Sequence, residues 1–213
     1  MPSKLNVPPT KSSLLSVQRD LDFASEGYDL LEQKRQILVI ELMSQVARAK
    51  TIQQEVEAGL RRAYEAAAEA ALTMGSEAMR REVSGIRADH RVRVAGRQVM
   101  GISLPTVRLE VARLAAQVAP GAGSARSDAV MLAFREVLEK IGQLAEIETV
   151  VFRVARELRK TQRRVNALDK LFIPSYRETI DFITDTLEER EREGFVVMKI
   201  LKSRAEARRE GRV

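Results

Sequence analysis

No proline interrupts the chain between Thr10 and Thr73, and an apolar repeat runs through that whole stretch. The repeat has the three- and four-residue spacing of a coiled-coil heptad and begins at Leu14 and Val17. At a rise of about 1.5 Å per residue, a helix of this length is on the order of 95 Å long and cannot fold back into one compact globule. The sequence therefore predicts an N-terminal tail over residues 1–10 and a long coiled-coil helix over residues 11–74.

A second periodic stretch predicts the partner helix. It begins near Ser127, which we expect to cap it, and its apolar positions continue through Phe172 and Ile183 to the end of a helix over residues 127–202. Pro174 lacks a backbone N–H and crowds the carbonyl of the residue four positions earlier, so we expect a kink there. Residues 203–213 are interpreted as a basic C-terminal tail.

The middle of the chain, residues 75–126, is rich in glycine and differs in kind. Charged and β-branched residues alternate over residues 91–94, and residues 99–109 offer a second short strand, which predicts a β-hairpin with its turn at residues 95–97. The predicted fold class is mainly α, a long antiparallel two-helix coiled coil with a small irregular or β-hairpin module between the helices. The composition agrees, because 31% of residues are charged and only 4% are aromatic.

The net charge of +6 is concentrated at the two ends of the chain. Residues 1–19 hold three basic residues and no acid, and residues 199–213 hold six basic residues and two acids. An antiparallel pair would bring these ends together as one basic tip. That tip is open to three interpretations: a solvated end, a contact with an acidic protein surface, or a contact with nucleic acid. A membrane-surface role for residues 195–202 is conceivable, although one short apolar element anchors only weakly.

Several classes of function are excluded or disfavoured. The chain has no cysteine, which rules out disulfides and thiolate chemistry, and no phosphate-binding glycine motif precedes a Lys-Ser or Lys-Thr pair. Its only histidine, His90, has no partner for acid–base chemistry in the pattern. No apolar run approaches the roughly 20 residues that span a bilayer, and the first residues do not resemble a signal peptide. We expect a chain that is not itself a catalyst and needs no cofactor or metal.

Two glycines lie within the first predicted helix, where each costs about 1 kcal/mol relative to alanine. Gly59 occupies a position of the apolar repeat and Gly27 does not. We therefore expect Gly27 to be the better candidate for contact with an outside partner. The alanines that follow Gly59 in the repeat predict a close approach of the two helices near the middle segment.

Three segments, in order along nearly the whole chain, resemble the D subunit of the V-type and A-type rotary ATPases. The first comprises Leu21, Ala24, Gly27, Leu30, Leu31, Lys34, Arg35, Leu38 and Glu41. The second comprises Val99, Met100, Gly101, Ile102 and Pro105. The third and most specific comprises residues 163–168, Ile173, Pro174, Thr179, Ile183, Leu187, residues 189–191, Phe195 and Lys199.

The resemblance implies a non-catalytic central-stalk rotor component on the cytoplasmic face of a membrane, which it would touch only through the complex. Implied partners are the A and B subunits of the catalytic head, the F subunit of the stalk and the funnel-shaped component that couples to the membrane ring, without nucleic acid. We take as candidate partner contacts Gly27, Lys34, Arg35, Val99, Met100, Gly101, Arg163, Arg164, Asn166, Pro174, Lys199 and Lys202. A cytosolic coiled-coil adaptor and, less favoured, a basic nucleic-acid-binding rod stay open as alternatives.

Overall fold

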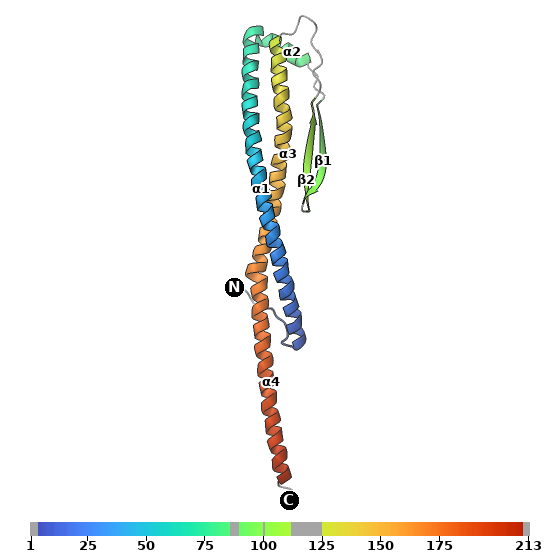
Figure 1. The fold of residues 1–213 in the computed structure, drawn as a ribbon, viewed down its shortest axis with the longest axis vertical. Coiled ribbons are helices and arrows are strands. Elements are labelled where there is room, and N and C mark those ends of the chain that lie inside the picture. Colours follow the sequence, from blue (N-terminus) through green and yellow to red (C-terminus); the bar gives the residue numbers. More distant parts are fainter. Residues whose placement is uncertain (1–3, 86–89, 100, 112–124, 211–213) are drawn as a thin grey trace. The chain divides into compact units, whose positions relative to one another are not determined.

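The computed structural model describes residues 4–85, 90–99, 101–111 and 125–210. The chain divides into two compact units, one formed by Met1–Gln36 with Arg159–Val213 and the other by Ile37–Leu158. The elements are α1 (Lys11–Met74), α2 (Ser76–Gly85), β1 (Arg91–Val99), β2 (Ile102–Glu110), α3 (Ala125–Ala167), a π-helical turn (Leu168–Phe172) and α4 (Ile173–Glu210) (Figure 1). The predicted fold class, two long helical segments with a β-hairpin between them, is confirmed.

Helix α1 buries the repeat that the sequence predicted. Its first turn is capped by Thr10, whose hydroxyl accepts a hydrogen bond of 3.1 Å from the backbone N–H of Ser13. Every repeat position from Leu14 to Ala70 is buried or half-buried, and the last, Thr73, is exposed. The heptad thus marks the packed face of the helix along almost its whole length.

In the unit formed by Ile37–Leu158, α1 packs antiparallel to α3. One cluster joins Val56 and Ala63 of α1 to Val137 of α3, with Tyr64 set edge-on to Phe134 at a centroid separation of 5.5 Å. A close contact occurs at Gly59, where an added Cβ would lie 2.8 Å from Cγ2 of Val137. Only glycine admits the valine methyl at that distance.

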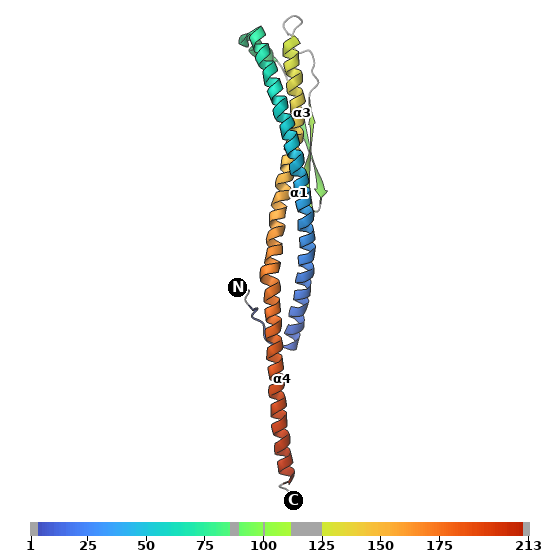
Figure 2. The same ribbon diagram turned by 60° about the vertical axis from the view of Figure 1, so that its left-hand side comes forward.

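The hairpin packs against both helices of the same unit. Its residue Leu104 is 1% exposed and joins Leu38 of α1 and Val150 and Val154 of α3 in a second cluster. Burial of such a leucine side chain contributes about 1.5–3 kcal/mol. Figures 1 and 2 both show the hairpin lying beside α3.

The predicted turn of the hairpin at residues 95–97 is wrong. These residues lie within β1, where Gly96 stands opposite Pro105 in the antiparallel register, and the last pair is Val99 with Ile102. The positive φ of 77° falls at Gly101 instead, and glycine is the residue that adopts such a backbone without strain. A second difference is α2, a short helix within the segment that was expected to be irregular.

The second helical segment departs from the prediction in three places. It begins at Ala125, so Ser127 lies inside the helix rather than capping it. A π-helical turn precedes Pro174, with the N–H of Ile173 bonded to the carbonyl of Leu168. The wider turn rotates Phe172 outward, so this predicted core residue is exposed.

The expected tail over residues 203–213 is also wrong for residues 203–210, which are helical as the end of α4. Alanine, arginine and glutamate are good helix formers, and residues 203–210 contain no proline or glycine. The ion pair of Lys202 with Glu206, at a spacing of four residues, supports the same helix. Residues 211–213 lie outside the described part of the chain.

Candidate functional site

The described residues hold no metal-binding constellation. Among them no group of three or more histidines, carboxylates or cysteines is placed to bind a metal ion, and His90 is exposed on the way into β1. Within the same residues no helix combines the length and apolar character that crossing a bilayer needs. The surfaces that remain to be explained are places where other molecules could bind.

The end of α4 is the most prominent of these surfaces. Every residue from Glu188 to Glu206 is exposed, and the stretch from Phe195 to Leu201 is apolar except for Lys199. In both views α4 continues beyond the start of α1, so this part of the helix has no paired helix beside it (Figures 1 and 2). We call residues 195–202 the α4 overhang. A helix that is apolar on most sides and has no intramolecular partner fits burial by another chain.

The candidate residues Lys199 and Lys202 lie on the α4 overhang, and both are exposed. Lys202 is 3.9 Å from Glu206. The expected single basic tip does not form, because the N-terminal cations contact α4 earlier in its sequence. The amine of Lys11 lies 2.9 Å from Glu191, and that of Lys4 lies 3.3 Å from the centroid of the Phe182 ring.

These cations belong to an N-terminal clasp, residues 4–11, that follows α4. The N–H of Leu5 donates to the hydroxyl of Thr179 at 3.0 Å, and Arg190 donates to the carbonyl of Pro9 at 3.0 Å. The hydrogen bond and charge of Lys11 lower the pKa of the Glu191 carboxyl, and the same contact raises the pKa of Lys11. Sequence reasoning missed the clasp, since no spacing in the sequence connects residues 4–11 with Thr179 or Glu191.

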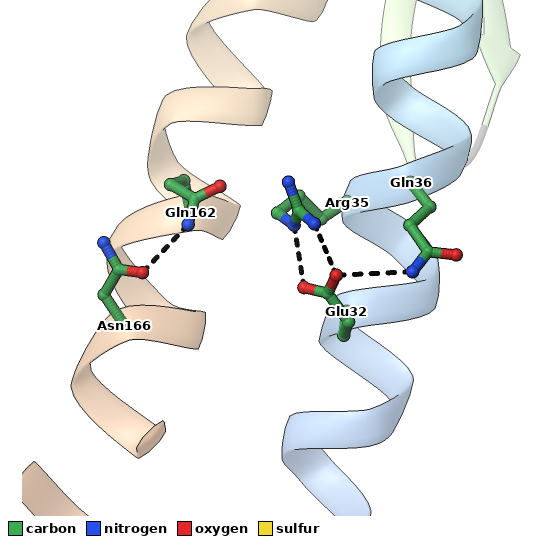
Figure 3. Close-up of polar contacts among 5 residues, drawn as sticks. All are labelled: Glu32, Arg35, Gln36, Gln162 and Asn166. Atoms are coloured by element: carbon green, nitrogen blue, oxygen red, sulfur yellow. Dashed lines mark hydrogen bonds and ion pairs between the residues drawn. The ribbon is translucent and has the colours of Figure 1, made fainter. Parts of the chain in front are cut away.

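A second polar site lies where the candidate residues Arg35 of α1 and Asn166 of α3 are found on neighbouring turns of the two helices (Figure 3). On α1, Arg35 donates to Glu32 through two nitrogens, with Nε at 2.7 Å from Oε2, and Gln36 donates to the same carboxylate at 3.3 Å. On α3, Gln162 donates to Asn166 at 2.9 Å. Figure 3 shows Arg35 on the side of α1 that faces α3, with each group bonded along its own helix.

The ion pair of Arg35 with Glu32 explains how the charged Arg35 can occupy a position of the apolar repeat. Its fork-shaped guanidinium matches the carboxylate of Glu32, and the hydrogen bonds from Arg35 lower the pKa of that carboxyl. Both side chains are half-buried. Arg35 is therefore satisfied within its own helix, whereas the neighbouring Arg163 and Arg164 of α3 are exposed.

The remaining candidates are spread over separate places. Gly27 faces open space, since an added Cβ would meet nothing within 4 Å, and Lys34 is half-buried with an interaction of its own. Val99 packs against the cluster around Leu104, and Gly101 is exposed at the hairpin end. Pro174 is half-buried, and Met100 lies outside the described residues. The twelve candidates therefore form several surfaces rather than one site.

Comparisons with known proteins agree on a family. The family model described as the D subunit of ATP synthase matches residues 13–203. The D subunit of the V-type ATP synthase of Thermotoga neapolitana is 36% identical over 200 residues, which cover 94% of this chain and 98% of that protein. The D subunits of the A-type ATP synthases of Thermococcus kodakarensis and Pyrococcus furiosus are each 34% identical over 211 residues, covering 98% of this chain and 99% of theirs. With its repeat buried between two long helical segments and a hairpin inserted between them, the chain belongs to the family of ATP synthase D subunits.

Proposed function

We propose that the chain is the central-stalk rotor component of a V/A-type rotary ATPase. In this role it is not a catalyst and binds no cofactor, but transmits torque between the A/B catalytic head and the membrane ion-translocating ring, in support of ATP synthesis or ATP-driven ion pumping. The observation that carries the proposal is α1, an unbroken helix of 64 residues whose repeat is buried or half-buried from Leu14 to Ala70.

A buried repeat suits the transmission of torque. Side chains in protein interiors are packed about as densely as organic crystals, so a twist applied at one place displaces its neighbours instead of being absorbed by voids. At Gly59, for example, an added Cβ would lie 2.8 Å from Cγ2 of Val137, so the valine side chain fills the space over the glycine. Two packed helices also have distinguishable sides, which would let the catalytic interfaces of the head around them be in different states.

The proposed partners are those that the family resemblance implies, and we assign each of them to a surface of a separate element. We assign the α4 overhang, with Lys199 and Lys202, to the inner surface of the head formed by the A and B subunits. The hairpin, with Val99, Met100 and Gly101, is assigned to the foot of the stalk near the F subunit and the funnel-shaped component. Gly27, Lys34, Arg35, Arg163, Arg164, Asn166 and Pro174 are the further candidate contacts. The chain would then lie peripherally on the cytoplasmic face of the membrane and reach it only through the complex.

Rotation can be observed directly, because the chain has no cysteine and an introduced one is unique. The variant Arg81→Cys places a thiol on the exposed surface of α2, where a bead can be attached after assembly with the A and B subunits of the same organism. Stepwise rotation of the bead on addition of ATP is the expected result, and the chain without A and B is the control.

Two outcomes would contradict the rotor role. One is a stable complex with A and B that hydrolyses ATP while the bead stays still. The other is recovery of the tagged chain as a homo-oligomer or with nucleic acid, and without head subunits, from gently solubilised host membranes and cytosol.

A further inference from the structure

The outer edge of β2 makes contacts with α3, and the outer edge of β1 differs from it in this respect. On β2, the N–H of Val107 donates to the carboxylate of Glu146 at 2.7 Å, and the carbonyl of Ser103 accepts a hydrogen bond from Arg153. Between them stands Pro105, which has no N–H to leave unpaired. The outer edge of β2 is therefore covered by side chains of α3.

The register then shows which groups point outward from β1. In an antiparallel ladder, residues opposite each other both point toward the partner strand or both point away from it. Ser103, Pro105 and Val107 point away from β1, and they stand opposite Gln98, Gly96 and Val94. The N–H and C=O groups of those three β1 residues, and by the same alternation of Val92, are directed away from the ladder.

This outer edge of β1 lies open. In the described part of the chain the sheet has only these two strands, and every residue of β1 from Arg91 to Gln98 is exposed. Proteins normally blunt such an edge with a proline, a bulge, charged side chains or a covering element, because it is a template for another strand. Among the described residues, a proline and side chains of α3 cover the edge of β2, whereas of these features β1 carries only charged side chains.

The side chains of β1 give the open edge a definite chemistry. Three arginines, at positions 91, 93 and 97, lie on one face of the strand, and Val92 and Val94 lie on the other, with 62% and 66% of their surface exposed. Across residues 91–110 there are four arginines and a single acid, Glu110, which lies 3.1 Å from Arg93. A strand placed beside β1 would thus meet positive charge on one face and apolar surface on the other.

We propose that the open edge of β1 binds an extended segment of a partner protein in which acidic and apolar residues alternate, adding a third strand to the hairpin. Its backbone pairs with the outward groups of Val92, Val94, Gly96 and Gln98, its acids lie beside the arginines, and its apolar residues cover the two valines. The exposed edge belongs to the chain by itself, so this binding can be tested without the A and B subunits and separately from the rotor role.

The test uses the full chain and a fluorescent peptide as long as β1, nine residues, with alternating glutamate and valine and blocked ends. The key variant is Val94→Pro, which removes one outward N–H and leaves the bonds between β1 and β2 in place. We expect the peptide to bind the unchanged chain and to bind the variant at least about tenfold more weakly. The same peptide with N-methyl groups on alternate amides keeps its charge but cannot pair, and is expected to show the same loss.

Fold integrity of the variant is checked by the protection of the Val107 amide from hydrogen exchange, which reports the bond to Glu146. Equal binding of the N-methylated peptide would mean charge attraction alone and would overturn the proposal, as would unchanged binding to Val94→Pro. Absence of any binding overturns it as well. A dimer of the chain that Val94→Pro abolishes, without peptide binding, would show that a second copy occupies the edge instead.

Discussion

At the scale of single residues, the two glycines of α1 have opposite surroundings. An added methyl at Gly59 meets Val137 at 2.8 Å, and a β-branched side chain cannot turn aside easily, whereas a methyl at Gly27 meets open space. We therefore expect Gly59→Ala to lower the free energy of unfolding by about 1–3 kcal/mol, from overpacking. Gly27→Ala is the control and should raise it by up to about 1 kcal/mol, from helix propensity. Chemical denaturation followed by circular dichroism measures both, and equal effects would contradict the packing at Gly59.

The pair of Lys11 and Glu191 makes the clasp sensitive to pH. Because the pKa of Glu191 is lowered from 4.5, its contribution is present above that value and is lost as the pH falls through the lowered pKa. Because the pKa of Lys11 is raised from 10.5, its contribution is present below that value and is lost as the pH rises through the raised pKa. We expect Lys11→Met to return the pKa of Glu191 toward 4.5 in a carboxyl NMR titration. An unchanged titration would show that the two groups do not interact.

At the scale of elements, the clasp depends on one buried hydroxyl. Thr179 accepts from the N–H of Leu5 and donates to the carbonyl of Ser175, and it is 1% exposed. Replacement by valine keeps the shape and removes the acceptor, at a cost of about 1 kcal/mol. We expect Thr179→Val to speed hydrogen exchange at Leu5 and cleavage of the N-terminal segment by proteases.

A matched control lies about two helical turns away. The hydroxyl of Thr186 donates to the carbonyl of Phe182 in the same way, and within the described residues it makes no long-range bond. Thr186→Val should therefore leave the exchange of the Leu5 amide unchanged. If both variants free the segment equally, the effect belongs to α4 and not to the clasp.

The packing of the hairpin against α1 and α3 depends on the side chain of Leu104. The side chain is enclosed by Leu38, Val150 and Val154, so truncation leaves a cavity that packed helices cannot close fully. We expect Leu104→Ala to cost about 2–5 kcal/mol and to speed exchange of the Val107 amide. Leu72→Ala, at a leucine that is 88% exposed, is the control. A small effect at Leu104 would mean that the hairpin is held by its polar contacts alone.

The sequence predicted these elements to different degrees, for physical reasons. The heptad in the sequence marks the packed face of α1 because the residues that face the partner helix recur with the same seven-residue period along the whole helix. In the second helical segment the apolar pattern wrongly predicted that Phe172 is buried, because a π-helical turn changes the period there. The pattern also did not include Val150, which is buried because the hairpin covers it. The clasp arises from contacts between residues more than 170 positions apart, which no local pattern records.

At the scale of the whole molecule, attachment to the head is expected to depend on the α4 overhang. Replacing Phe195 and Met198 with serine removes two exposed apolar side chains that have no role in the helix pair. We expect the double variant to bind the A/B head roughly tenfold or more weakly, as for central interface residues. Phe23→Ser, at an exposed residue of α1, is the control. Equal losses would move the head contact away from the overhang.

The charge at the same end is expected to act through salt. Deletion of residues 203–213 removes the arginines at positions 204, 208, 209 and 212. Binding to the head should weaken and become less dependent on ionic strength. Unchanged affinity together with unchanged salt dependence would show that the basic end is only solvated.

The overhang has a geometric property that the paired helices lack. Successive residues of a helix are set about 100° apart, so Phe195, Val196, Val197, Met198, Ile200 and Leu201 are distributed around the full circumference. A ring-shaped wall enclosing this segment would meet apolar surface on most sides, interrupted at Lys199. In the rotor role that we propose, the segment would turn inside such a wall while keeping apolar contact in most orientations, and the paired helices would supply the asymmetry.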